Sequence, residues 1–304
     1  MQLQGLQPQR QAINTNLVAP IRAAVTRLDP MPTIRMLSLI LPIVMIIAST
    51  AAHCTRPQLI EAVDSYLSTQ ITGQTDPFKA RFDNSTWLGY FENNVKVDIN
   101  TGILNTPLAV THNRSLYDTT ACATYTEVIV NSTTTPHVIG TQLRFTNHKI
   151  NKVDTIITKP GDWLFNVTGY AFYSSKENWS TIPAAARDTR TTIKAAADAY
   201  LDIFNAPNTI VPWGIPCVRL EGGLYGDEGP NGTCAGFIPT GVPITRRRYV
   251  IDEEVGSVDV MVDFGKSVWP DSHEFRVEGG KLRYVHTMTH CGIANCGVGN
   301  GTVV

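Results

Sequence analysis

The sequence contains the same pattern of residues twice. Residues 274–287 (EFRVEGGKLRYVHT) have the pattern of a β-hairpin with a Gly-Gly turn, and residues 142–155 (QLRFTNHKINKVDT) follow the same register 132 positions earlier. A second pair of segments, residues 56–67 and 190–201, shares Arg, Asp and Tyr-Leu positions at an offset of 134 and has apolar residues at helical spacing. The chain is therefore predicted to form one unit twice, each opening with an amphipathic helix and closing with a hairpin.

The segments between helix and hairpin predict an α+β fold for each unit. Strand-like runs occupy residues 94–99 and 124–130 in the first copy and 248–252 and 257–264 in the second. A helix that covers the apolar face of a following antiparallel sheet gives such a unit. We expect tandem units at residues 53–165 and 185–291, joined by a linker at 166–184 and followed by a Gly-rich tail at 292–304.

The first 52 residues are predicted to lie outside the fold. Residues 36–48 (MLSLILPIVMIIA) form an uncharged apolar run that is short for a membrane span and has the layout of a secretory signal, with cleavage expected near position 51 or 52. Residues 1–30 are interpreted either as a transit peptide or as an extension ahead of a start at Met31, and the second is preferred. The mature chain is expected to keep no membrane span.

Glycosylation signals and cysteines agree with a secreted or extracellular protein. Seven Asn-x-Ser/Thr sequons follow the apolar run, at Asn84, Asn113, Asn131, Asn166, Asn178, Asn231 and Asn300. All 6 cysteines also follow it, and an even number in an oxidising compartment argues for disulfides. Among the 15 connectivities that six cysteines allow, we predict Cys217–Cys234, Cys291–Cys296 and Cys54–Cys122.

Charge and motifs exclude several classes of function. With 25 basic and 26 acidic residues, the chain has no basic excess that would attract nucleic acid. It has no phosphate-binding loop, dinucleotide fingerprint or nucleophile elbow, so no cofactor is expected. His286, His290, Cys291 and Cys296 have a spacing that zinc ligands can adopt, but cysteines of a secreted chain are expected to pair with each other, and no metal is predicted.

Two resemblances add to this interpretation. Residues 211–223 (VPWGIPCVRLEGG), 246–256 (RRRYVIDEEVG) and 270–291 (PDSHEFRVEGGKLRYVHTMTHC) resemble a family of secreted fungal proteins of unassigned function, over nearly the whole mature chain. A helix followed by a curved antiparallel sheet that ends in this hairpin also resembles the nuclear-transport-factor-2-like (NTF2-like) cone of ketosteroid isomerases, scytalone dehydratase and polyketide cyclases. The resemblance implies tandem cones but no particular reaction, because such cones include enzymes and non-catalytic binders.

The second hairpin contains the strongest chemical candidate. If its strands pair without interruption from the Gly-Gly turn, His273 faces His286. Two opposed imidazoles lower each other's proton affinity, so one can act as base and the other as acid, with Asp271 orienting His273. The same face would carry the apolar wall and one hydroxyl, from Phe275, Val277, Leu282 and Tyr284. The alternative is a histidine pair that only caps the edge of a sheet.

Arg248 and Tyr249 are weaker candidates for a substrate pocket. They begin a strand, where the arginine could bind an enolate or carboxylate; the alternative is a solvated strand end. The Gly-rich segment between Cys217 and Cys234 is interpreted as a lid or as a disulfide-pinned surface loop.

These features lead to three functional hypotheses. The first is a cofactor-independent cyclase, isomerase or dehydratase, including a pericyclic Diels-Alder type, that acts on an apolar terpenoid or polyketide in fungal secondary metabolism. His273 and His286 would move protons, and Tyr284 would donate to the developing oxyanion. The second is a secreted glycoprotein that binds an apolar ligand without chemistry or forms a homodimer. The third is a cell-surface protein whose cavities are filled by its own side chains.

Overall fold

The computed structural model describes residues 54–226, 229–236, 238–293 and 296. The expected signal, the segment before it and Asn300 lie outside these residues. Among the helices of the described residues, none combines the length and apolarity that crossing a membrane requires.

Helices and strands follow one another in the same order in two halves of the chain. The first half contains α1 (Arg56–Thr72), α2 (Asp76–Lys79), β1 (Gly89–Glu92), β2 (Val95–Val97), η1 (Ile103–Asn105), β3 (His112–Asp118), β4 (Ala123–Val130), β5 (His137–Thr146) and β6 (Lys149–Thr158). A connecting segment contains α3 (Val167–Ser174) and η2 (Ala184–Ala186). The second half contains α4 (Arg190–Ile203), β7 (Trp213–Glu221), β8 (Leu224–Gly226), β9 (Ile244–Asp252), β10 (Ser257–Phe264), β11 (Trp269–Glu278) and β12 (Lys281–Thr289).

Each half forms a six-stranded mixed sheet, and the two sheets have the same strand order. The orders are β2-β1-β6-β5-β4-β3 and β8-β7-β12-β11-β10-β9. All neighbouring strands are antiparallel except the pairs β1–β6 and β7–β12, which are parallel. The α+β class is thus confirmed, and the shared order agrees with a duplicated unit. The expectation of purely antiparallel sheets was wrong, because the first strand of each half lies beside the last strand of that half and runs in the same direction.

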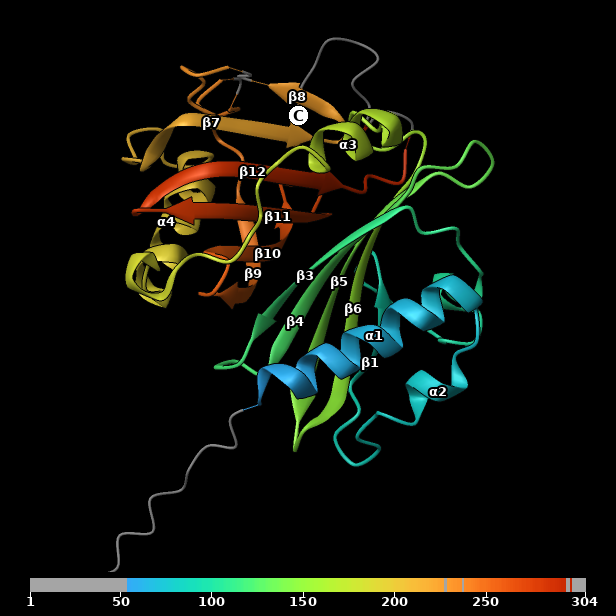
Figure 1. Cartoon of the computed structure of the whole chain (residues 1–304). Helices are drawn as coiled ribbons and strands as arrows, with labels where there is room; N and C mark the ends of the chain where they lie inside the picture. Colours follow the sequence, from blue (N-terminus) through green and yellow to red (C-terminus); the bar gives the residue numbers. More distant parts are fainter. Residues whose placement is uncertain (1–53, 227–228, 237, 294–295, 297–304) are drawn as a thin grey trace, which may run out of the picture. The chain divides into compact units, whose positions relative to one another are not determined.

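Both predicted helices are present, and their caps explain where they begin. Thr55 and Gln58 form a reciprocal capping box at the start of α1, and Gly73 ends this helix in the left-handed conformation, with φ 71°. Thr189 caps α4 by accepting a hydrogen bond from the Thr192 N–H with its side-chain oxygen. Figure 1 shows α1 lying across the strands of the first sheet, so its apolar side is buried against them.

A β-bulge in the second long hairpin changes which side chains share a face. Next to the turn, Val277 pairs with Leu282. One step further Arg276 pairs with Tyr284, which leaves Arg283 as an extra residue on β12. Because side chains alternate along a strand, this insertion moves every later residue of β12 to the opposite face. The first long hairpin has its bulge at the equivalent position, Asn151, so the device is part of the repeated unit.

The predicted pairing of the two histidines was therefore wrong. His273 lies opposite Thr287, and His286 lies opposite Glu274. His273 shares its face with Phe275, whereas His286 and Tyr284 lie on the other face. A single inserted residue in a run of alternating polar and apolar residues leaves no mark that the sequence pattern could show.

The predicted disulfides are confirmed: Cys54–Cys122, Cys217–Cys234 and Cys291–Cys296 are all formed. They indicate an oxidising environment of the secretory or extracellular kind. The six sequon asparagines within the described residues are all exposed, so their use as glycosylation sites stays a prediction. The predicted linker contains α3, which contributes Val167 and Tyr170 to a buried cluster.

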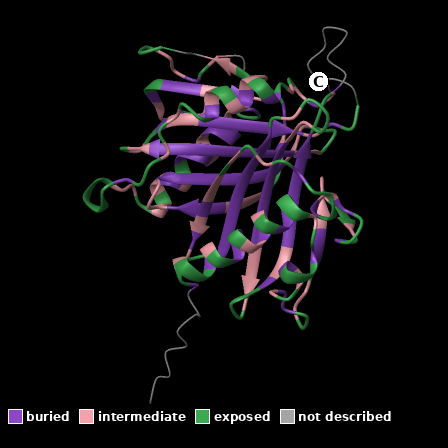
Figure 2. Ribbon diagram, turned by 45° about the vertical axis from the view of Figure 1, so that its right-hand side comes forward, coloured by how far each residue is buried: buried purple, intermediate pink, exposed green. Residues whose placement is uncertain are grey.

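Buried residues concentrate on the strands of both sheets (Figure 2). One apolar cluster belongs to each half, and a third contains residues of both, including Tyr125 and Ile129 of β4 and Val250 and Met261 of β9 and β10. The two halves are thus held together by a common apolar core as well as by the chain.

Equivalent residues of the two halves form reciprocal ion pairs. Arg56 binds both carboxylate oxygens of Asp252, at 2.9 Å and 2.9 Å. Arg190, 134 positions after Arg56, binds both oxygens of Asp118, at 2.7 Å and 2.7 Å, and Asp118 is itself 134 positions before Asp252. Such reciprocity is the rule for isologous dimers, so the halves contact each other as two protomers of a symmetric dimer would.

Candidate functional site

The second half encloses an apolar cavity of about 400 Å³. Its walls are mostly aromatic and aliphatic, with a few polar groups on one side. The lining residues are Trp163, Leu164, Tyr200, Phe204, Arg219, Glu221, Leu224, Ile238, Pro239, Phe264, Trp269, Asp271, His273, Thr287 and Thr289. A concave apolar site with few convergent polar groups is the usual form of a small-molecule site.

His273 and Asp271 form an ionisable pair in the wall of this cavity. The alternation of β11 places both side chains on the cavity face, and His273 Nδ1 lies 2.5 Å from Asp271 Oδ1. Both side chains are buried, and neither of these two atoms makes an aligned hydrogen bond among the described residues. The other oxygen of Asp271 accepts a hydrogen bond from Thr289 Oγ1 at 2.5 Å. Buried polar atoms without an aligned partner are rare and often belong to functional sites.

The Asp271 carboxylate lies beside one particular ring nitrogen of His273. A carboxylate beside Nδ1 favours the tautomer that carries its proton there, and this leaves Nε2 as the basic nitrogen. The expectation that Asp271 and His273 share a face agrees with the geometry, and the orienting role of Asp271 stays a prediction.

Tyr200 supplies a hydroxyl that sequence reasoning did not select. It projects from α4, and its ring centroid lies 5.7 Å from that of His273. Burial raises the pKa of Tyr200 to about 12, so the phenol stays protonated and can donate a hydrogen bond. The residue was visible only as a core position of a helix, because its neighbourhood to His273 depends on tertiary packing.

An ion pair lies at another part of the wall. Glu221 accepts a hydrogen bond from Trp163 Nε1 at 2.7 Å and lies 3.2 Å from Arg219 Nε. Trp163 belongs to the segment after β6, which approaches the β7–β8 turn closely. A Cβ on Gly222 would lie 2.3 Å from the Trp163 carbonyl oxygen, so only glycine fits there. The Gly-rich segment thus begins as a tight hairpin turn that closes one side of the cavity.

The equivalent place in the first half is filled by the chain itself. Thr141 stands where the second half has His273, and its hydroxyl lies 2.9 Å from Tyr66 Oη and 3.1 Å from Thr155 Oγ1. Phe78 packs against Tyr66 with ring centroids 6.1 Å apart. The Thr141 hydroxyl thus has polar partners, and the Tyr66 and Phe78 rings are in contact at this place.

Replacing Tyr66 with Phe tests this account of the first half. We expect the free energy of unfolding to fall by about 1 kcal/mol, because the buried Thr141 hydroxyl loses one partner. Urea unfolding of the variant measures the change, and Thr141→Val provides the second arm of a double-mutant cycle. An additive cycle would show that the two hydroxyls do not interact.

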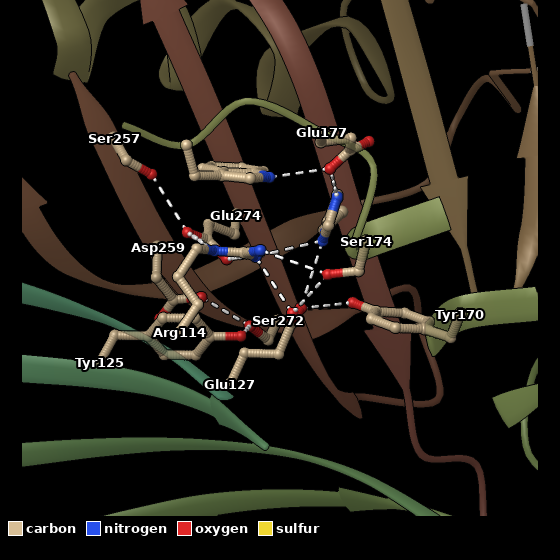
Figure 3. A network of polar contacts seen from close by, with 12 residues as sticks. Arg114, Tyr125, Glu127, Tyr170, Ser174, Glu177, Ser257, Asp259, Ser272 and Glu274 are labelled. Atoms are coloured by element: carbon tan, nitrogen blue, oxygen red, sulfur yellow. Dashed lines mark hydrogen bonds and ion pairs between the residues drawn. The ribbon is translucent and has the colours of Figure 1, made fainter. Parts of the chain in front are cut away.

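His286 and Tyr284, the other predicted catalytic residues, lie outside the cavity. His286 is part of a buried polar network between the two halves, whose other members include Arg114, Glu127 and Glu274 (Figure 3). Arg114 Nη2 lies 2.6 Å from Glu274, 3.1 Å from Glu127 and 3.3 Å from His286 Nδ1. The predicted proton transfer between two neighbouring histidines is therefore not available.

The network sets the charge of its members. Burial alone would lower the pKa of His286, but Glu177, whose Oε2 lies 2.5 Å from Nε2, and Glu127 outweigh it and raise the pKa to about 9. Burial alone would raise the pKa of Glu127, but Arg114 and His286 outweigh it and hold this pKa well below its usual range. His286 is thus a cation at neutral pH and serves as a structural charge.

The same residues resemble a metal site, but a guanidinium already fills it. Ligand atoms of Glu127, Glu274 and His286 lie within 4.8 Å of one another. Arg114 contacts all three and supplies the positive charge that an ion would bring. The zinc spacing considered in the sequence fails for another reason, since Cys291 and Cys296 form a disulfide.

The remaining predicted pocket residues divide into two groups. Phe275, Val277 and Leu282 are fully buried in the apolar cluster that also contains Tyr200, so they support the cavity wall from behind. Arg248 and Tyr249 line a different cleft on the surface of the protein.

One comparison with known proteins concerns this half. Residues 186–289 match a family model described as "Domain of unknown function (DUF8021)". The match covers α4 and strands β7 to β12, including His273 and Asp271. No curated protein matches the chain. The comparisons therefore set the second half apart as a recurring unit but supply no reaction.

Proposed function

We propose that the second half binds an apolar small molecule and moves a proton on it, in a non-redox isomerisation, cyclisation or dehydration. The observation that carries this proposal is the buried His273–Asp271 pair facing an apolar cavity of about 400 Å³. That volume suits a ligand of the size of a terpenoid or polyketide intermediate. The proposal includes an NTF2-like cone for each half and passage through the secretory pathway.

The chemistry follows from three side chains. His273 Nε2 takes a proton from carbon, and the Asp271 carboxylate stabilises the imidazolium. Tyr200 donates its hydroxyl proton as a hydrogen bond to the enolate oxygen that develops. The imidazolium then returns the proton to another carbon, or to a hydroxyl that leaves as water. No oxidant or reductant is consumed.

Metabolite profiling of the source organism tests the proposal. Deletion of the gene should remove a product and accumulate a precursor whose mass is equal or differs by one water. The wild type should restore the product, and His273→Gln and Tyr200→Phe should each lower its formation by a factor of about 100 or more, the scale of general acid-base catalysis and of oxyanion stabilisation. His148→Asn, an exposed histidine in the other half, is the matched control and should restore it fully.

Two outcomes would change the proposal. If the profile is unchanged, and mass spectrometry finds an apolar ligand on the purified protein that survives incubation unaltered, the protein is a non-catalytic binder. If His273→Gln restores full product formation, the acid-base mechanism is wrong and only a cavity that acts by shape remains.

A further inference from the structure

A second cleft, of about 530 Å³, lies between the two halves and is lined by positive charge. Arg144 and Lys152 reach it from the first half, and Arg190, Lys194 and Arg248 reach it from the second. Arg190 and Lys194 are one helical turn apart on α4, so they lie on one side of that helix. Among the described residues that line the cleft, none is acidic.

Three carboxylates behind the cleft balance part of this charge. Arg190 is paired with Asp118, and Lys194 lies 2.6 Å from Asp198. Asp154 is shared by two cations, Lys152 at 2.7 Å and Arg248 at 3.0 Å.

Arg144 has no such partner. Its guanidinium donates to the neutral amide oxygen of Gln142 at 2.5 Å, and no carboxylate of the described residues lies within 4.0 Å of it. Asp198 is moreover shared with Arg247, which does not line the cleft. The five cations of the cleft therefore outnumber the three carboxylates that pair with them by two. A fourth carboxyl, Asp259, lies behind Gln142 at 2.5 Å from its Nε2, and burial raises its pKa well above the usual range.

The surroundings of Arg114, on the opposite side of the molecule, show which carboxylates the cleft lacks. Arg248 lies 134 positions after Arg114, and the two residues occupy equivalent places on β9 and β3. Arg114 pairs across the strands with Glu127, whereas Arg248 pairs with Met261. The ring of Trp179 covers the Arg114 guanidinium, and the Arg114 Cζ lies 3.8 Å from the centroid of that ring.

Two further carboxylates are replaced in the same way. Glu274, which binds Arg114, corresponds to Gln142 at the offset of 132. Arg276 corresponds to Arg144 and is paired with Glu278 at 2.8 Å, at a position where the first half has Thr146. One side thus neutralises its arginines with its own carboxylates. On the other side the only carboxylate of the described residues that pairs with Arg248 is Asp154, which it shares with Lys152, and Arg144 has the amide of Gln142.

We propose that this cleft binds a dianionic phosphate group, which takes the place of the carboxylates present on the opposite side of the molecule. The planar forks of Arg144 and Arg248 match phosphate oxygens, and Lys194 adds a mobile point charge at the rim. Burial lowers the pKa of Arg144 and of Arg248, whereas the pKa of Arg114, with its carboxylates, is raised. In Arg144 and Arg248 burial outweighs the nearby carboxylates, whereas in Arg114 the carboxylates outweigh burial.

Calorimetric titration of the full chain at pH 7.5 tests the proposal with two probes, inorganic phosphate and glycerol 3-phosphate, at constant ionic strength set by NaCl. We expect saturable binding of at least one probe and a rise in Tm with its concentration. Arg144→Gln should weaken binding about tenfold or more, and Lys194→Gln, at a half-exposed side chain, should weaken it several-fold without affecting folding. Tighter binding of the ester than of free phosphate would assign the site to an organic phosphate, and the reverse to the free ion.

Arg246→Gln is the matched control, because Arg246 lies on the same strand, carries the same charge and does not line the cleft. It should leave both affinities unchanged. The proposal is overturned if neither probe binds more tightly than chloride, or if Arg144→Gln and Lys194→Gln bind as the wild type does. These results are independent of the cavity that contains His273.

Discussion

Replacement of Asp118 with Ala is expected to lower the free energy of unfolding by about 3 to 5 kcal/mol. The Asp118 side chain is 0% exposed, binds Arg190 with both oxygens and accepts hydrogen bonds from the backbone N–H groups of Ala121 and Ile251. Its removal leaves a part-buried guanidinium and two backbone donors without their partner. Equilibrium unfolding in urea measures the loss.

The symmetry of the molecule supplies a second arm to this experiment. Asp252→Ala breaks the equivalent pair with Arg56 and should cost a similar amount. Asp76→Ala is the control, since this carboxylate is 91% exposed in its ion pair with Lys79 and should change stability by less than about 0.5 kcal/mol. Equal effects of all three substitutions would show that the reciprocal pairs do not hold the halves together.

The stability of the protein is also expected to fall between pH 6.5 and pH 9 by about 3 kcal/mol, because of His286. The folded-state pKa of His286 is raised from 6.5 to about 9, so its contribution is fully present below pH 6.5 and is lost as the pH rises through 9. Glu127 acts in the opposite direction, since its folded pKa is lowered from 4.5 and its contribution is lost as the pH falls below that value. Stability should therefore be greatest between these two ranges.

Thermal unfolding as a function of pH checks this expectation. In His286→Gln the alkaline loss should disappear, and in Glu177→Gln it should be smaller and end at a lower pH, because Glu177 is a main cause of the raised pKa. His148→Asn, at an exposed position, should keep the wild-type profile. An alkaline loss that persists unchanged in both network variants would contradict the assignment.

Much of the fold could be predicted from the sequence, because its signals are local or repeated. The helices that begin at Arg56 and Arg190 have apolar periodicity and capping residues, and the hairpins have alternation and turn residues. The repeat itself indicated that both halves would share one topology. The disulfides followed from compartment and spacing.

The candidate site was predicted only in part, for reasons that are physical. Asp271 and His273 are two residues apart on one strand, so their common face needed no knowledge of register. His286 was misplaced because Arg283 bulges, and a bulge is decided by sheet twist and packing. Tyr200 and Glu221 reach the cavity from elements far away in the sequence, and such neighbours follow only from the three-dimensional arrangement.

The reciprocal pairs of Arg56 with Asp252 and Arg190 with Asp118 also have a consequence for how such a protein can change. In a homodimer every substitution occurs twice, so a mutation that opens a pocket must open two and a lost charge is lost on both sides. Covalent fusion of the copies removes that coupling. One half can then accumulate a histidine and a void while its twin keeps threonine and aromatic filling, and assembly no longer depends on the concentration of the protein.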